Sequence, residues 1–250
     1  MKPIEQFNIS RLIPLHLFGY DVSFTNSALF MVLVLAATII VMIFGSSKAA
    51  LVPGRFQAVA EMFYEFVANM VRSTTGEAGM TFFPFVFSLF MFIFFANLLG
   101  LIPYAFTVTS HVIITVTMAL MVFFTVIIVG FAKNGVHFLK LFVPSGVPLW
   151  IMPFVVPIEI ISFFTRPVSH SIRLFANMLA GHITLQVFAG FVVMLLGAGA
   201  WATLGILPFA FTVVLFSLEL LVAFLQAYVF AMLTCMYLND ALHVGHGVDA

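Results

Sequence analysis

The stretch ALFMVLVLAATIIVMIFG, from Ala28 to Gly45, is the clearest fold signal in the chain, because it contains no charged residue. A helix of about 20 apolar residues is long enough to cross the ~30 Å hydrocarbon core of a bilayer. The stretch begins well inside the chain and is longer than the roughly 7–15-residue apolar core of a signal peptide. We therefore expect a membrane helix that is retained in the mature protein.

The rest of the chain has the same character, since 64% of its 250 residues are apolar and 7% are charged. A soluble domain carries about 25% charged residues. An outer-membrane barrel would show alternating segments of about 10 residues, which this sequence lacks. We therefore expect an all-α, polytopic protein of the lipid bilayer, with about five membrane-embedded helices and one amphipathic surface helix.

The charge balance and the cysteine count exclude several kinds of site and partner. The formal net charge is zero, so nothing indicates a nucleic-acid partner. Cys235 is the one cysteine, and by itself it provides neither a disulfide nor a metal framework. A GxxxxGK[ST] phosphate loop is absent, so nucleotide chemistry is not expected in this chain. We expect no cofactor and no metal.

Apolar runs and their interruptions organise the chain, which we interpret as a single membrane domain, residues 1–250. In the segment 54–75, Arg55, Glu61 and further charges share a helix with apolar residues, as in a helix at the membrane interface or one packed on protein. The run 149–196 would form about 70 Å of helix, so it must be tilted, broken or partly outside the lipid. The expected elements are an outer-side segment (1–25), a first span (26–45), the surface helix (54–75), two spans (81–102 and 111–131) and two long tilted helices (150–196 and 205–240).

Lysine and arginine positions predict the orientation. The connections 46–80 and 132–148 together contain five such residues, whereas the opposite loops, at about 101–110 and 197–205, contain none. Positive residues favour the cytoplasmic side. We therefore expect the N-terminus outside and the C-terminus inside, although the N-terminal tail also carries positive charge. The residues concerned are Lys48, Arg55, Arg72, Lys133 and Lys140, with Lys2 and Arg11 in the tail.

The stretch HSIRLFANMLAGH, from His170 to His182, places a cation within an apolar helix. An arginine at the bilayer centre costs about 2.5–3.5 kcal/mol on insertion scales, so Arg173 indicates a cavity or a pathway, as Glu159 does. For Ser162 and Ser169 alone, simple packing against other helices is the favoured interpretation. For Glu159, the structural alternative is a salt bridge with Arg166, seven residues on along the same face. A period of 3.6 residues puts the polar residues of this helix on one face. This polar stripe consists of Glu159, Ser162, Arg166, Ser169, Arg173 and Asn177, with His170 as a further supporting residue.

The last long helix adds a second acid, Glu219, which shares a face with Gln226, seven residues on. His182 lies about 180° around the helix from Arg173 and is a natural partner for a buried carboxylate. Glu159 would lie about 21 Å inward of Arg173, whereas Glu219 lies in the outer half of the membrane. This arrangement predicts two proton routes that do not connect, with a permanent cation between them.

Three motifs resemble subunit a of the membrane sector of F-type ATP synthases, of the alphaproteobacterial or mitochondrial type: RLFANMLAGH (173–182), PVSHSIRLFANM (167–178) and LELLVAFLQAYVFAMLTCMYL (218–238). The resemblance implies a stator subunit of a rotary enzyme, not catalytic by itself, that conducts protons to and from a carboxylate on a ring of c subunits. The implied partners are this ring, peripheral-stalk subunit b, the rest of the ATP synthase complex, the lipid bilayer and protons. The implied location is the bacterial inner membrane, with the mitochondrial inner membrane as the alternative.

The resemblance also implies residue roles. Arg173 looks like the arginine that faces the ring and blocks direct proton leak. Two polar residues, Asn177 and Gln226, look like its neighbours on the ring-facing surface. Glu219 and His182 look like the outer half-channel, and Glu159 looks like the acid of the inner half-channel.

Two other functions remain open from the residues alone. A proton-coupled secondary transporter would bind an anionic substrate at Arg173, although the sequence lacks the internal repeats of many transporter folds. An intramembrane enzyme is disfavoured, because the long helices contain no HExxH or GxSxG motif. His243 and His246 lie in a C-terminal HVGHG tail that is more typical of a solvated end than of a metal site.

Overall fold

The computed structural model describes most of the chain. Lys2, Lys48, Pro103 and His246, and most of the connection between the last two helices, lie outside the described residues. The described residues are 10–14, 16–17, 20–21, 23–46, 53–102, 105–143, 148, 150–197, 203 and 205–243.

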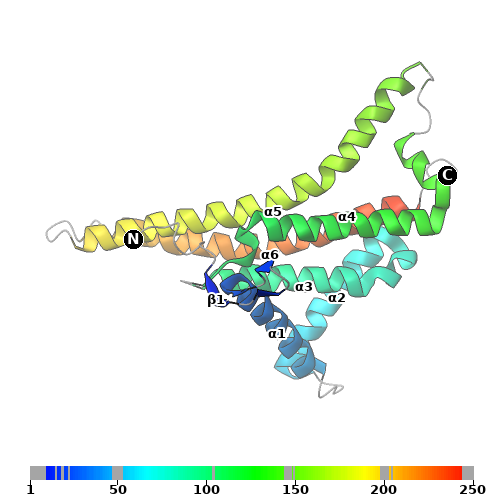
Figure 1. Ribbon diagram of the computed structural model, residues 1–250. Coiled ribbons are helices and arrows are strands. Elements are labelled where there is room, and N and C mark those ends of the chain that lie inside the picture. The colour runs from blue at the N-terminus through cyan, green and yellow to red at the C-terminus, as the bar shows by residue number, and fades with distance from the viewer. Residues whose placement is uncertain are drawn as a thin grey trace. The chain divides into compact units, whose positions relative to one another are not determined.

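Long helices make up nearly all of the described chain (Figure 1). Five helical stretches within it are long and apolar enough to cross a membrane, so the predicted all-α polytopic fold is confirmed. The second stretch combines two helices, which a short 3-10 turn, η2 (Met80–Phe82), joins. The helices are α1 (Asn26–Ser46), α2 (Arg55–Gly79), α3 (Phe83–Gly100), α4 (Val112–Asn134), α5 (Met152–Leu196) and α6 (Ile206–Leu242), with 3-10 segments η3 (Val108–Ser110) and η4 (Gly135–Phe142).

The sequence did not predict the short strands that precede α1. β1 (Arg11–Ile13) pairs antiparallel with β4 (Phe24–Thr25), and β2 (His16–Leu17) pairs antiparallel with β3 (Tyr20–Asp21). Strands of two or three residues are too short to show a recognisable alternation of apolar and polar positions. At the start of α1, Asn26 Oδ1 accepts hydrogen bonds from the backbone N–H groups of Ser10 at 3.1 Å and Ser27 at 2.9 Å.

The charged helix α2 turns one face to α3. Tyr64 lies 4.8 Å from Phe83 between ring centroids, and Phe66 lies 5.7 Å from Phe90. Its charged residues are exposed, in keeping with the predicted amphipathic helix. Near its end Gly76 has φ +66°, a left-handed conformation that favours glycine, and the flanking Arg72 and Glu77 form an ion pair at 3.0 Å.

Two compact units divide the chain, and each combines distant segments. The first unit contains the described residues of Met1–Ile43, Met91–His111 and Leu174–Ala227. The second unit contains those of Phe44–Phe90, Val112–Arg173 and Tyr228–Ala250. The helices α5 and α6 therefore contribute to both units.

In the second unit, aromatic contacts fix the first half of α5. The ring of Phe163 on α5 lies 5.1 Å from Phe123 of α4 and 5.3 Å from Phe142 of η4, measured between centroids. The neighbouring Phe138 packs so closely on Gly130 of α4 that any side chain there would clash. Aromatic pairs of this kind add about 0.5–1.5 kcal/mol each to the gain from burial.

In the first unit, a buried polar connection ties three elements together. The Asn97 side chain on α3 donates from Nδ2 to the Ala223 carbonyl of α6 at 3.2 Å. The Thr109 hydroxyl of η3 donates to Asn97 Oδ1 at 2.8 Å. Both side chains are fully buried, so these hydrogen bonds are needed to satisfy the polar atoms. They hold the segment between α3 and α4 against α6.

Candidate functional site

The central feature of the first unit is a facing pair of ionisable side chains from the last two helices. His182 of α5 and Glu219 of α6 lie 3.6 Å apart, measured from Nδ1 to Oε1. Both residues are buried, with 6% and 4% of their surfaces exposed. Neither carboxyl oxygen of Glu219 has a hydrogen-bond partner among the described residues. Because a buried polar group without a hydrogen bond is costly, a proton shared between these two side chains is the natural way to satisfy them.

A glycine makes this approach of the two helices possible. Gly181 precedes His182 on α5, and a Cβ atom at this position would lie 2.7 Å from Glu219 Oε1 and 3.0 Å from its Cδ. Any side chain there would therefore push the carboxyl group away from α5. The sequence contained Gly181 within the AGH motif, but we assigned it no role.

The other nitrogen of the imidazole has its own neighbour. His182 Nε2 lies 3.1 Å from the Oγ1 atom of Thr107, in the segment between α3 and α4. The same hydroxyl donates a hydrogen bond to the Gly100 carbonyl at the end of α3, at 3.4 Å. The sequence analysis missed Thr107. A signal was present, because the segment FTVTS (106–110) places three hydroxyl residues between two apolar helices.

A second histidine lies close by in this segment. The His111 ring stacks on Phe106 with 4.6 Å between centroids and an interplanar angle of 15°. Burial lowers the pKa of His111 below its ordinary value, since desolvation disfavours the imidazolium form. At neutral pH this imidazole is therefore neutral and fills an aromatic contact.

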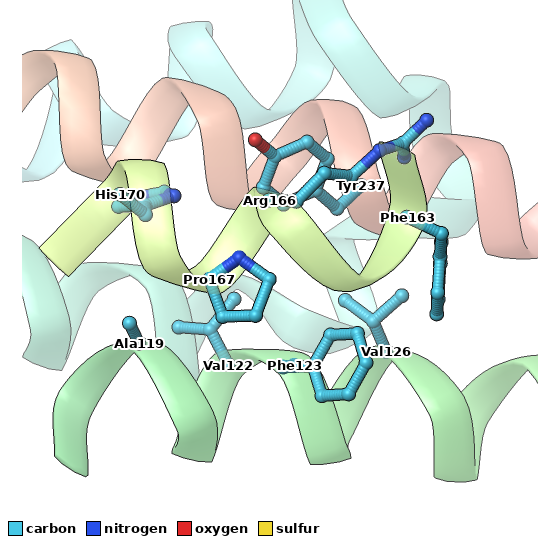
Figure 2. Close-up of a pocket in the computed structure, with 9 residues that line it drawn as sticks. All are labelled: Ala119, Val122, Phe123, Val126, Phe163, Arg166, Pro167, His170 and Tyr237. Atoms are coloured by element: carbon cyan, nitrogen blue, oxygen red, sulfur yellow. The ribbon is translucent and has the colours of Figure 1, made fainter. Parts of the chain in front are cut away.

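In the second unit, Arg166 of α5 has a carboxylate partner on α6. Its Nη1 donates to Asp240 Oδ2 at 3.0 Å. The guanidinium also lies over two aromatic rings, 5.1 Å from the centroid of Tyr237 and 5.5 Å from that of Phe163. Figure 2 shows Arg166 beside Tyr237, with Pro167 pointing towards Phe123 of α4. We call the contacts of Arg166 with Asp240, Tyr237 and Phe163 the polar clamp; it joins α5 to α6.

The polar clamp corrects one expectation. The structural alternative to a proton-pathway role for Glu159 was a salt bridge with Arg166, seven residues on. That pairing is wrong, because Arg166 pairs with Asp240. Seven residues correspond to about 10.5 Å along a helix, whereas Asp240 comes from the facing helix. Sequence reasoning missed Asp240, since the period of one helix does not identify its partner on another.

His170 has different surroundings from the polar stripe with which we grouped it. Its ring is buried and meets Phe230 of α6 at 4.0 Å between centroids, with Tyr237 at 5.9 Å. Figure 2 shows His170 among the residues that line a small apolar pocket beside the clamp. His170 therefore packs inside the protein. Of the other stripe residues, Ser162, Ser169, Arg173 and Asn177 are exposed, and Glu159 and Arg166 are half-buried.

Arg173 projects from an exposed part of α5. Among the described residues, no carboxylate or hydrogen-bond acceptor pairs with its guanidinium. Three of the exposed residues at helical spacing around it are small, namely Ser169, Ala176 and Ala180, and the fourth is the polar Asn177. Small residues allow a neighbouring helix to approach closely. This face of α5 therefore presents a charge to whatever packs against it.

No metal site is evident in the described part of the chain, where no group of three or more His, Cys, Asp and Glu side chains is arranged to hold an ion. Gln226, which shares a face with Glu219 by spacing, is half-buried. The facing side chains of His182 and Glu219 can bind and exchange a proton.

Comparison with known proteins gives full-length matches. The family model described as ATP synthase A chain matches residues 28–239. A protein named ATP synthase subunit a from Mesorhizobium japonicum is 63% identical over 247 residues, with 98% of both chains covered. Proteins of the same name from Rhodopseudomonas palustris (strain HaA2) and Maricaulis maris are each 60% identical, again with 98% of both chains covered.

Proposed function

Because the chain belongs to the ATP synthase A chain family, we propose that it is the stator subunit that conducts protons through the membrane sector of a rotary ATP synthase. In this role it binds no nucleotide and is not catalytic by itself. Protons pass through two offset half-channels, to and from a carboxylate on a ring of c subunits. The family match and the five apolar helical stretches support this function.

The observation that carries the proposal is the buried pair of His182 and Glu219, 3.6 Å apart on neighbouring helices. Ionisable groups are rare within membrane helices and typically belong to ion pathways or proton relays. This pair forms the outer half-channel. A proton taken up there passes to the ring carboxylate. The resulting carboxyl group is neutral and can therefore turn into the lipid.

Arg173 keeps the two half-channels separate. Its guanidinium effectively never loses its proton, so protons cannot cross it, whereas a buried lysine can be deprotonated. The exposed charge favours the ionised form of the ring carboxylate, so the protonated carboxyl group loses its proton to the inner half-channel near Glu159 before it passes Arg173. Asn177 and Gln226 are polar neighbours of this passing carboxylate. The membrane potential contributes about 2.3 kcal/mol per charge per 100 mV to the driving force.

The exposed faces of α5 and α6 support a ring of c subunits as the partner. Only 6% of the most apolar 18 residues of α5 and 11% of those of α6 are buried, compared with 39% for the most apolar 18 residues of Arg55–Gly100 and 33% for those of Val112–Phe142. The α1 stretch is also 11% buried but contains no charged residue, as expected for a lipid-facing helix. The charge of Arg173 on α5 instead requires a polar partner.

The remaining assignments follow from the same function. The protein lies in the inner membrane of a bacterium, as the bacterial relatives suggest, with its N-terminus outside and its C-terminus inside. Peripheral-stalk subunit b and the rest of the ATP synthase complex hold it against the rotating ring. The alternative of an anion transporter has no support from the relatives' names.

The test uses Arg173→Ala in the assembled complex, reconstituted in vesicles. We expect the complex to assemble, to lose proton-driven ATP synthesis, and to leak protons passively. Arg72→Ala is the matched control, because Arg72 is exposed and its pair with Glu77 is of a type that contributes at most about 1 kcal/mol. Normal coupled synthesis in assembled Arg173→Ala complexes would overturn the barrier role.

A further inference from the structure

We propose that Thr107 is a positioning residue that holds His182 in the tautomer with its basic nitrogen towards Glu219. The inference rests on the proposed proton pathway through His182 and Glu219. Thr107 touches neither the ring of c subunits nor Glu219 in this proposal. It acts through the imidazole of His182. The Nε2 atom of this ring lies 3.1 Å from Thr107 Oγ1, and the Nδ1 atom lies 3.6 Å from Glu219 Oε1.

The direction of the hydrogen bonds follows from the second partner of Thr107. Gly100 is the last residue of α3, and the final carbonyls of a helix lack donors from within the helix. The Thr107 hydroxyl donates to the Gly100 carbonyl at 3.4 Å. A carbonyl oxygen can only accept, and a hydroxyl has one hydrogen. With that hydrogen directed to Gly100, Thr107 Oγ1 accepts from His182, which therefore carries its proton on Nε2.

Close packing holds Thr107 in this position. A Cβ atom at Gly100 would lie 2.7 Å from the Cγ2 and 3.1 Å from the Oγ1 of Thr107, so the threonine rests directly on the end of α3. Only 2% of the Thr107 surface is exposed, which leaves its hydroxyl little access to water. The hydroxyl therefore has two fixed neighbours, one carbonyl and one imidazole nitrogen.

The consequence is a defined proton transfer. With Nε2 protonated, the lone pair of His182 Nδ1 faces the carboxyl group of Glu219. When Glu219 gives up its proton, the O–H bond breaks, its electron pair stays on the carboxylate, and a new N–H bond forms at Nδ1. The resulting imidazolium donates from Nδ1 to Glu219 and from Nε2 to Thr107. In the opposite tautomer Nδ1 already carries a hydrogen and cannot accept this proton.

Thr107 does not offer the proton on Nε2 an exit. A proton passed from Nε2 to Thr107 would have to displace the hydroxyl hydrogen onto the Gly100 carbonyl, which is a poor base. The proton therefore leaves the imidazole at Nδ1, where the N–H bond breaks and the proton returns to the carboxylate of Glu219, which passes it on. Thr107 orients the ring and stabilises its charged form, as a carboxylate or carbonyl partner does for a metal-bound histidine.

The experiment compares Thr107→Val with Thr107→Ser in the assembled complex. Valine keeps the shape of threonine but has no hydroxyl, whereas serine keeps the hydroxyl. We expect proton flux per assembled complex to fall about tenfold in Thr107→Val, the size expected for the loss of one buried hydrogen bond. Thr107→Ser should restore most of the flux.

The matched control is Thr109→Val, in the same segment. Thr109 is also fully buried and also loses a hydroxyl, but its partner is Asn97 and not His182. We expect reduced assembly or stability in this variant, with near-normal flux per assembled complex. A second readout is nitrogen-15 NMR of histidine-labelled complex in vesicles, with the His182 signal identified by its loss in His182→Gln. Wild-type protein and Thr107→Ser should show protonated Nε2, and Thr107→Val a mixture of tautomers.

Three outcomes would overturn the inference: unchanged flux in Thr107→Val, failure of Thr107→Ser to restore the flux, or a wild-type His182 protonated on Nδ1 alone. Failure of the underlying function looks different. If His182→Gln and Glu219→Gln both leave the flux unchanged, the proposed pathway is wrong. If these two variants lose flux while Thr107→Val does not, the pathway stands and the role of Thr107 is wrong.

Discussion

Replacing Gly181 with alanine tests whether the close approach of Glu219 to α5 controls proton transfer. The added Cβ would lie 2.7 Å from Glu219 Oε1, and ordinary contact begins at 3.4 Å, so the oxygen must move by 3.4 − 2.7, or about 0.7 Å. A misplacement of about 1 Å at a reacting group can cost about 100-fold in rate. We therefore expect proton flux per assembled complex to fall by about 10- to 100-fold.

The effect on stability should be smaller. Alanine is favoured over glycine within a helix by about 1 kcal/mol, whereas overpacking of a buried site costs about 1–3 kcal/mol. The two contributions oppose each other, so the free energy of unfolding should fall by at most about 2 kcal/mol. Flux and stability thus respond very differently to the same methyl group.

Gly190→Ala is the matched control on the same helix, because a Cβ there meets no atom within 4 Å. It gains the same helix preference without touching Glu219. The assay is passive proton flow through reconstituted membrane sectors, normalised to assembled complex, together with the thermal unfolding midpoint. We expect normal flux in Gly190→Ala. Equal flux in the two alanine variants would refute the reasoning.

Three further predictions concern ionisable side chains. Single replacements of His182 and Glu219 should each slow proton flux, and the double variant should lose much less flux than the sum of the two single losses, because the effects of groups that act as a unit are not additive. Strictly additive losses in a double-mutant cycle would contradict direct coupling. In a background without the native cysteine, Glu159→Cys should react with aqueous thiol reagents added on the inner side, and Glu219→Cys, if water reaches it, should react with reagents added on the outer side. Labelling of both cysteines from the same side would contradict two half-channels. Asp240→Asn should weaken the clamp with Arg166, lowering stability by about 1 kcal/mol while flux per assembled complex stays normal, because the pair is partly exposed; a large loss of flux would place the clamp in the proton path.

The membrane class and the helical fold could be read directly from the sequence. A run such as Ala28–Gly45 has few alternatives in lipid, because every backbone polar group there must be satisfied within the segment. Helical spacing likewise grouped Ser169, Arg173 and Asn177, which the structure leaves exposed. These properties depend on residues close together in the chain, so composition and period suffice to predict them.

Contacts between helices depend on the tertiary structure. The period of a helix predicts which residues share a face but not which helix covers that face. For this reason Arg166 was not matched with Asp240, and the burial of His170 against Phe230 was not predicted. Thr107 reaches His182 from 75 residues away in the sequence, and Gly181 matters because of an atom on another helix. Distances of a few ångströms between such distant residues arise only when the helices pack, because no local pattern encodes which side chains will meet.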